Sequence, residues 1–216
     1  MKYEAVIFDL DGTLVDTIDD LRASVNLALA QQGFPPRTRE EIRAFVGNGV
    51  RKLMERSVPQ GTPPQVTDVC LAAFRAHYHT HACVHTRPYD GIPAVLEALR
   101  AAGMKTAVVT NKTEAASLAV VRHFFGDRIG LTIGQREDLP RKPAPDGVLL
   151  ALETLGVPAS RAVFIGDSEV DCATARNAGL PCIGAAWGFR GRAVLEAEGV
   201  QVIADQPSEL TALCLG

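Results

Sequence analysis

The chain has 216 residues, 47% of them hydrophobic and 22% charged, and its 22 Lys or Arg against 25 Asp or Glu give a net charge of −3. These values fit one globular domain, or a domain with an insertion, and exclude disordered, collagen-like and disulfide-stapled mini-protein classes. No long run of basic residues offers a footprint for nucleic acid or an anionic membrane, so we expect a small-molecule partner.

Short apolar runs typical of strands buried in a parallel sheet recur along the chain, over residues 3–10, 105–110, 129–133, 162–166, 181–185 and 200–204. Helical patterns lie between the later runs, over residues 93–102, 113–124, 146–155 and 168–178, and most are followed by a glycine. This alternation of strand and helix predicts an α/β fold with a parallel sheet and right-handed crossovers.

Residues 16–85 break the alternation, because they show helical patterns only. Leu21, Val25 and Leu29 recur at helical spacing, and Thr38 with Glu41 forms a capping box before another helical stretch. We therefore expect a helical module over 16–85, inserted into an α/β core made of 1–15 and 86–216. Its two ends must lie near the end of the first strand, and a module tethered in this way can act as a lid.

Carboxylates follow two of the predicted strands, at the sheet edge where open α/β sheets bind ligands. Asp9 and Asp11 are two residues apart in an extended segment, so they point to the same side. Two such carboxylates need a cation to ionise together. Asp167 ends another strand and can complete an all-oxygen site of the kind that Mg²⁺ prefers. The sequence thus predicts a magnesium site.

A phosphate bound to that magnesium would still need positive charge and hydrogen-bond donors. Three residues that follow strands or lie in loops can supply them: the Lys142 ammonium, the Thr110 hydroxyl and the Asn111 amide. The chemistry that this combination predicts is phosphoryl transfer.

Four segments carry these residues in order, namely 9–16 (DLDGTLVD), 109–112 (VTNK), 142–146 (KPAPD) and 166–171 (GDSEVD). They resemble the four motifs of the haloacid dehalogenase superfamily of phosphatases, and the resemblance covers essentially the whole chain. It implies a Rossmann-like core with an all-helical cap inserted after the first motif. Within the cap, the stretch from Phe45 to Arg56 is similar to the phosphoglycolate phosphatase branch.

The resemblance also implies a role for each residue. Asp9 would be the nucleophile that forms an aspartyl-phosphate, and Asp11 would protonate the leaving oxygen and then activate water. The Mg²⁺ ligands would be the Asp9 carboxylate, the Asp11 backbone carbonyl and Asp167. Asp171 would lie just outside them or orient a lysine. The positive charge and the remaining donors would come from Lys142, Thr110 and backbone amides.

Two features of the predicted cap have two interpretations each. The segment 47–52 (GNGVRK) can be a plain turn between helices, or a turn in which Asn48, Gly49 and Arg51 face the substrate. His77, His81 and His85 would share one helical face and could bind zinc, although we favour a purely structural stripe because no further ligand completes the set.

Several functions compete for this residue set. We expect 2-phosphoglycolate or a similar small phosphorylated metabolite as substrate, with a sugar-phosphate phosphatase or phosphomutase as the alternative. Asp11 argues against dehalogenation, since dehalogenases of this superfamily lack that acid. Phosphonate cleavage would need a Schiff-base lysine in the cap, where Lys52 is the only lysine. A receiver-type phospho-acceptor would lack the helical insertion, and an inactive binding relative would not keep the whole acidic set.

The cellular location is expected to be the cytoplasm. The five cysteines are widely spaced and form no C-x-x-C pair, which indicates reduced thiols packed as small apolar side chains. The first apolar run is too short for a secretion signal, and no later run has the length of a membrane span.

Overall fold

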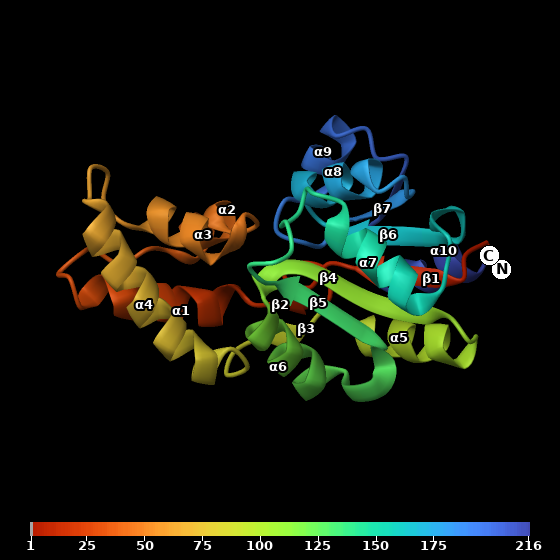
Figure 1. The fold of residues 1–216 in the computed structure, drawn as a ribbon, viewed down its shortest axis with the longest axis horizontal. Coiled ribbons are helices and arrows are strands. Elements are labelled where there is room, and N and C mark those ends of the chain that lie inside the picture. Colours follow the sequence, from red (N-terminus) through yellow and green to blue (C-terminus); the bar gives the residue numbers. More distant parts are fainter. Residues whose placement is uncertain (1) are drawn as a thin grey trace. The chain divides into compact units, whose positions relative to one another are not determined.

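The computed structural model describes residues 2–216, which form two compact units (Figure 1). The first unit runs to Asp16 and resumes over Pro88–Gly216, and the second is Thr17–Arg87. At the two crossings, β2 (Val15–Asp16) and β3 (Arg87–Pro88) pair as a two-stranded sheet. Strands of two residues are too short to leave a pattern in the sequence, and we did not predict them.

The first unit contains a six-stranded sheet in the order β5-β4-β1-β6-β7-β8, and each neighbouring pair is parallel. Each strand overlaps one of the six predicted runs, although β4 and β5 end later than predicted: β1 (Ala5–Phe8), β4 (Lys105–Thr113), β5 (Leu131–Gln135), β6 (Ala162–Gly166), β7 (Cys182–Ala185) and β8 (Val202–Ala204). Because β1 lies inside the sheet between β4 and β6, its carboxyl end is flanked by the ends of both. The predicted α/β class is confirmed.

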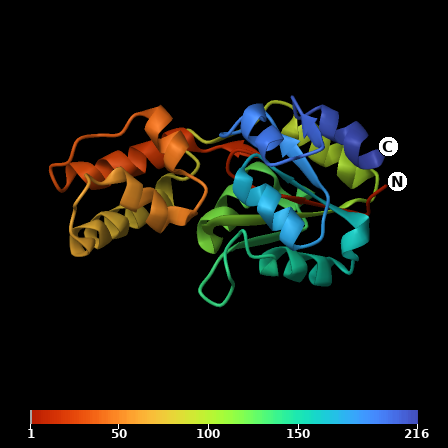
Figure 2. The same ribbon diagram turned by 90° about the horizontal axis from the view of Figure 1, so that it is seen from above.

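Helices cover both faces of this sheet, with α5 and α10 on one side and α7 and α8 on the other (Figure 2). Four of them match predicted helices: α5 (Ile92–Ala101), α6 (Glu114–Phe124), α7 (Asp146–Leu155) and α8 (Glu169–Asn177). Two more, α9 (Arg192–Ala197) and α10 (Glu209–Leu215), were not predicted because six or seven residues are too few for a clear helical period. Two 3₁₀ turns, Gly126–Arg128 and Ala159–Arg161, precede β5 and β6.

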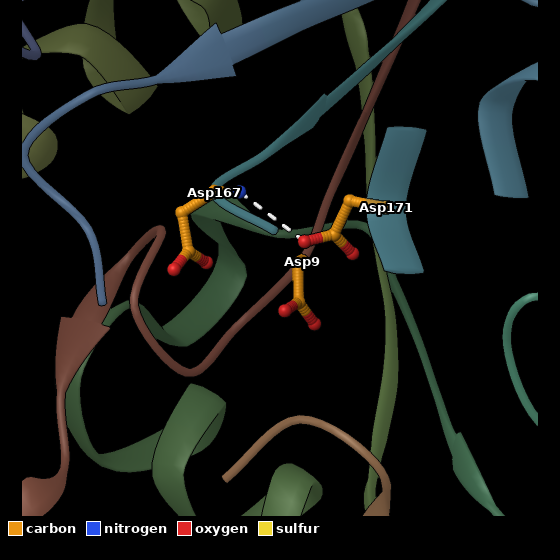
Figure 3. Close-up of side chains that lie close together, drawn as sticks. All are labelled: Asp9, Asp167 and Asp171. Atoms are coloured by element: carbon orange, nitrogen blue, oxygen red, sulfur yellow. Dashed lines mark hydrogen bonds between the residues drawn. The ribbon is translucent and has the colours of Figure 1, made fainter. Parts of the chain in front are cut away.

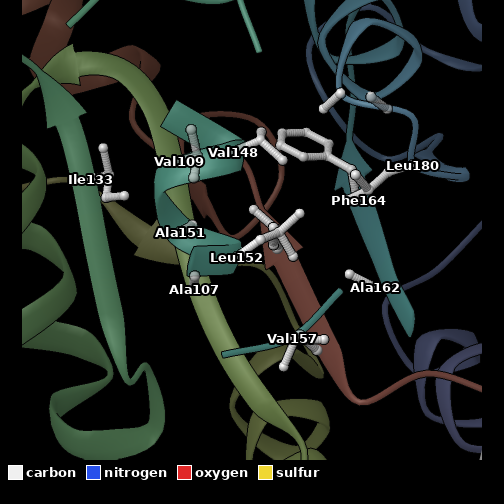
Figure 4. Packing of buried hydrophobic residues seen from close by; sticks show 14 residues of the cluster. Ala107, Val109, Ile133, Val148, Ala151, Leu152, Val157, Ala162, Phe164 and Leu180 are labelled. Carbon is white, nitrogen blue, oxygen red and sulfur yellow. The ribbon is translucent and has the colours of Figure 1, made fainter. Parts of the chain in front are cut away.

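The helix α7 shows how the core fixes the strands. It places Val148, Ala151 and Leu152, spaced three and four residues apart, against side chains of the central strands that include Val109 and Phe164 (Figure 4). Each is buried, and fully burying an aliphatic side chain of this size contributes about 1.5–3 kcal/mol. This packing holds the carboxyl ends of β4 and β6 in register with β1.

The second unit is all-helical, with α1 (Ile18–Ala30), α2 (Arg39–Phe45), α3 (Gly49–Ser57) and α4 (Pro64–His81). The predicted capping box starts α2, since Thr38 Oγ1 accepts from Glu41 N at 3.2 Å and Glu41 Oε2 accepts from Thr38 N at 2.8 Å. Helices α1 and α4 pack along each other around buried side chains such as Val25 and Phe74.

A buried carboxylate on α1 fixes the segment that follows α4. Asp20 accepts hydrogen bonds from His85 N at 2.9 and 3.0 Å, from Thr86 N at 2.9 Å and from Thr86 Oγ1 at 2.8 Å. Asp20 therefore ties the first helix of the unit to its last residues.

All five cysteines are free thiols, as predicted. Cys70, Cys172 and Cys214 are buried, and Cys182 is partly buried and packs against the hydrophobic core. Cys83 is partly exposed, so the expectation that every cysteine packs in the core is not met there. Within residues 2–216, no helix is both long enough and apolar enough to span a membrane.

Candidate active site

Asp9 directly follows β1 and lies almost completely buried. Its backbone N–H continues the strand pairing by donating to Ile165 O at 2.9 Å, which fixes the direction of the side chain. Asp9 Oδ1 is 2.8 Å from Lys142 Nζ. Burial raises the pKa of the Asp9 carboxyl to about 6, against the opposing pull of the Lys142 ammonium. A cation near this carboxylate would favour its ionised form.

Lys142 is held between two carboxylates. Its Nζ is 2.7 Å from Asp171 Oδ1 as well as 2.8 Å from Asp9. Burial alone would lower the pKa of Lys142, but the charges of Asp171 and Asp9 outweigh it and hold the pKa above its ordinary value. The other Asp171 oxygen accepts from Ser168 N, Ser168 Oγ and Asp167 N at 2.7–3.2 Å. Asp171 thus orients the lysine and caps α8 at the same time.

Asp167 directly follows β6, and each of its carboxylate oxygens accepts a hydrogen bond. Thr13 Oγ1 donates to Oδ1 at 3.0 Å, and Phe189 N donates to Oδ2 at 2.8 Å. Burial raises the pKa of the Asp167 carboxyl well above its ordinary value, and the nearby charges of Asp171 and Asp9 add to this effect. The two hydrogen bonds leave the carboxylate in one fixed orientation.

Asp9, Asp167 and Asp171 can each offer an oxygen within 4.8 Å of the others. The carboxylates of Asp9 and Asp167 point to the same side, whereas Asp171 reaches back to the backbone of Asp167 (Figure 3). Asp9 and Asp167 are therefore the pair placed to share a metal ion, and Asp171 is already engaged by its other partners.

The loop after β7 closes over Asp167 so tightly that only glycine fits at one position. A Cβ on Gly188 would lie 2.2 Å from Asp167 Cβ and 2.5 Å from Gly12 O. Gly12 itself has φ of +91°, and its own Cβ would lie 2.6 Å from Asp167 Oδ2. The same loop is fixed at Trp187, whose Nε1 donates to Thr13 O at 3.0 Å. From the sequence, residues 187–190 follow a predicted strand and could border the site, but packing of an aromatic loop on the core is the favoured interpretation. The contact of Phe189 N with Asp167 places the loop at the site.

The end of β4 supplies three consecutive buried residues, Thr110, Asn111 and Lys112. The pairing of β4 with β5 is irregular between Val109 and Thr113, so this stretch departs from simple alternation. Asn111 Nδ2 donates to Lys142 O at 3.1 Å, which braces the loop that carries the lysine. Lys112 N donates to Thr110 Oγ1 at 3.3 Å.

Lys112 was not predicted as a site residue. Its Nζ donates to Asp11 Oδ1 at 3.0 Å and to Oδ2 at 3.3 Å. With all groups ionised, the cluster holds four carboxylates (Asp9, Asp11, Asp167 and Asp171) and two ammonium groups (Lys112 and Lys142). Two negative charges remain, which one divalent cation would balance. The residues present therefore fit a bound Mg²⁺.

The residues of the helical unit that are predicted to contact the substrate interact with other residues of that unit. Asn48 Oδ1 accepts from Arg56 Nη2 at 2.9 Å, and α3 begins at Gly49. Arg51 Nη1 donates to Asp68 Oδ1 at 2.8 Å, and the two side chains are 51% and 55% exposed. A role of Asn48, Gly49 and Arg51 in substrate binding stays a prediction.

The histidine stripe does not converge on a common point. The rings of His77 and His81 stack with centroids 3.8 Å apart, and Nδ1 of His77 lies 2.9 Å from Ser24 Oγ. Helix α4 ends at His81, so His85 does not continue the face. This arrangement favours the structural interpretation of the stripe.

Comparison with known proteins decides the family. The family model described as haloacid dehalogenase-like hydrolase matches residues 6–185. The chain belongs to this family. The haloacid dehalogenase fold is shared by a crystal structure of a candidate phosphoglycolate phosphatase from Lactobacillus delbrueckii subsp. bulgaricus, which is 34% identical, covers 100% of both chains and has a TM-score of 0.94. The structure of CbbY from Rhodobacter sphaeroides in complex with phosphate matches at 28% identity over 96% of both chains with a TM-score of 0.77.

Two curated members of the family cover nearly the whole chain. A phosphoglycolate phosphatase of Thiobacillus denitrificans is 34% identical over 91% of this chain and 89% of its own length. An N-acetylmuramic acid 6-phosphate phosphatase of Pseudomonas aeruginosa is 32% identical over 97% of this chain and 94% of its own. The expected resemblance to haloacid dehalogenase phosphatases, and to phosphoglycolate phosphatases among them, is confirmed.

Proposed function

We propose that this haloacid dehalogenase-like hydrolase cleaves phosphomonoesters with Mg²⁺, through an aspartyl-phosphate on Asp9. The observation that carries the proposal is the buried charge set at the carboxyl ends of β1 and β6, where the Asp9 and Asp167 carboxylates point to the same side and Lys142 contacts Asp9. Mg²⁺, when bound by the Asp9 carboxylate, the Asp11 carbonyl and Asp167, would supply charge to the phosphate oxygens.

In the first step, an Asp9 oxygen attacks phosphorus while the bond from phosphorus to the ester oxygen breaks. Asp11 gives its proton to that leaving oxygen, so an alcohol departs. Lys142 offsets the negative charge that Asp9 and the phosphoryl group bring together. The Thr110 hydroxyl donates to a phosphoryl oxygen, and Asn111 holds the loop that carries Lys142. In the second step, water attacks the aspartyl-phosphate, Asp11 takes the proton, and inorganic phosphate leaves.

We propose 2-phosphoglycolate, or a similar small phosphorylated metabolite, as the substrate. This proposal rests on the curated relatives named phosphoglycolate phosphatase. A sugar-phosphate phosphatase is the second candidate, supported by the relative named N-acetylmuramic acid 6-phosphate phosphatase. A phosphomutase of the same superfamily stays an alternative. The cytoplasmic location stays a prediction.

The test is phosphate release from 2-phosphoglycolate, N-acetylmuramic acid 6-phosphate and glucose 1-phosphate, with Mg²⁺ and with EDTA. Asp9→Asn should lower kcat by about 10³-fold or more while the circular dichroism spectrum stays native, because it removes the nucleophile and keeps the shape. Turnover of glucose 1-phosphate to its isomer without phosphate release would favour the mutase. Equal rates for wild type and Asp9→Asn would contradict the nucleophile assignment.

A further inference from the structure

The side chains of Lys112 and Asp11 form a second ion pair of the buried charge set, separate from the pair of Lys142 and Asp9. Lys112 is 3% exposed in its side chain and Asp11 is 14% exposed, and the ammonium donates to both carboxylate oxygens. Both residues lie in the α/β unit, on β4 and on the loop after β1.

Stability alone is a weak reason to keep such a pair. Desolvating a lysine costs about as much as its ion pair returns, and an apolar side chain of similar volume packs equally well in many proteins. The value of the pair is therefore geometric. Two donated hydrogen bonds fix both the position and the plane of the Asp11 carboxyl group.

The position of Lys112 in the strand supports this interpretation. The register of β4 against β5 is irregular between Val109 and Thr113, and two successive residues in this stretch both reach the site: Asn111 donates to Lys142 O, and Lys112 donates to Asp11. Each of the two lysines holds a different aspartate, since Lys142 contacts Asp9 and Lys112 contacts Asp11. The nucleophile and the proton donor thus have separate cationic supports.

We propose that Lys112 is a positioning residue that aims the Asp11 carboxyl group at the leaving oxygen of the substrate: when Asp11 is protonated for the first step, one oxygen keeps its hydrogen bond from Lys112 and the other carries the proton toward the leaving oxygen. This inference rests on the proposed function, in which Asp11 protonates the departing oxygen. If Lys112 only positions the proton donor, its loss should slow the reaction most for substrates whose leaving oxygen must be protonated. An aryl phosphate with a stable phenolate leaving group needs little protonation, whereas an alkyl phosphate needs it fully.

The experiment compares kcat/KM for p-nitrophenyl phosphate and for an alkyl phosphate, at saturating Mg²⁺, in wild type, Lys112→Met and Lys112→Arg. We expect Lys112→Met to lose about 10²-fold on the alkyl ester and less than about 5-fold on the aryl ester, with Lys112→Arg intermediate. Lys105→Met, on the exposed start of the same strand, is the matched control and should leave both values unchanged. An equal loss on both esters would overturn the proposal.

A second comparison protects the test against misfolding of the single variant. In an Asp11→Asn background the carboxylate that Lys112 positions is absent, so adding Lys112→Met should lower kcat/KM by less than about 3-fold on either ester. A further 10²-fold loss in that background would show that Lys112 acts elsewhere. Failure of the proposed function would look different, because wild type would then release phosphate from neither ester or Asp9→Asn would remain active.

Discussion

The buried charge set of the α/β unit contrasts with the exposed Arg51–Asp68 ion pair of the helical unit. In the α/β unit, Asp9 and Lys142 are buried and paired, and the buried Asp167 carboxylate is held by Phe189 N, although burying charge is costly. In the helical unit, Arg51 and Asp68 form an ion pair with about half of each side chain exposed, which costs and contributes little. A buried charge set therefore identifies the chemistry of this protein, whereas an exposed pair says little about its substrate.

The largest loss of stability is expected from removing the Lys142 ammonium group, which pairs with two buried carboxylates. Lys142→Met leaves Asp9 and Asp171 facing each other without an ammonium group. We expect the free energy of unfolding of the α/β unit to fall by about 3–5 kcal/mol and phosphate release to fall by at least about 10²-fold. Urea unfolding followed by the fluorescence of Trp187, the single tryptophan, measures the first effect. The matched control is Lys105→Met, and a loss below about 1 kcal/mol for Lys142→Met would break the comparison.

A smaller effect is expected from crowding Asp167, the proposed metal ligand. Gly188→Ala introduces a methyl group 2.2 Å from Asp167 Cβ, so Asp167 or the loop must move. We expect the Mg²⁺ concentration for half-maximal thermal stabilisation of EDTA-treated protein to rise by about 10-fold or more. Gly199→Ala is the control: its φ of +77° strains an alanine there, but a Cβ meets no atom within 4 Å, so the variant should lose some stability without any change in Mg²⁺ binding. Unchanged Mg²⁺ binding in Gly188→Ala would show that the loop is not part of the metal support.

The helical unit has one buried carboxylate of its own, and it gives the next effect. Asp20→Ala leaves the backbone N–H groups of His85 and Thr86 without their acceptor. We expect a loss of about 3 kcal/mol in the helical unit, seen as an earlier transition by circular dichroism while the Trp187 fluorescence midpoint stays in place. Asp19→Ala, on the same helix and exposed, should cost less than about 1 kcal/mol. A joint shift of both signals would show that the two units unfold together.

The smallest change in stability is expected at the exposed pair. Arg51→Ala should alter the free energy of unfolding by less than about 1 kcal/mol. If the sequence-based assignment of Arg51 to substrate binding is right, KM for 2-phosphoglycolate should rise by about 10-fold, which equals about 1.4 kcal/mol. Asp68→Ala breaks the same pair from the other side and serves as control. Identical KM values in wild type and both variants would remove Arg51 from the site.

The sequence was most informative where residues near one another along the chain carry the signal. The six parallel strands and the helix α7 follow from local hydrophobic patterns, and Asp9 and Asp167 could be nominated because each directly follows such a strand. The capping box of Thr38 was also readable, because both partners lie within four residues.

The missed features depend on contacts between distant residues or on very short elements. Lys112 meets Asp11 across 101 residues, and Phe189 meets Asp167 across 22, so neither pairing leaves a periodic signal. The need for glycine at position 188 arises from the close approach of a loop to Asp167, which only the assembled fold creates. For β2, β3, α9 and α10 the stretch is too short for a period to emerge.

The strand order determines when, during synthesis, the residues of the candidate active site can first come together. The central strand β1 is made first, yet its two neighbours β4 and β6 emerge from the ribosome only after the whole helical unit. The helical unit closes its contacts within Thr17–Arg87 and can fold while the rest is still being made. At ordinary synthesis rates, Asp167 is added to the chain on the order of 10 s after Asp9. A nascent chain released before β6 would carry Asp9 and the helical unit, but it would lack Asp167, the second carboxylate of the proposed metal site.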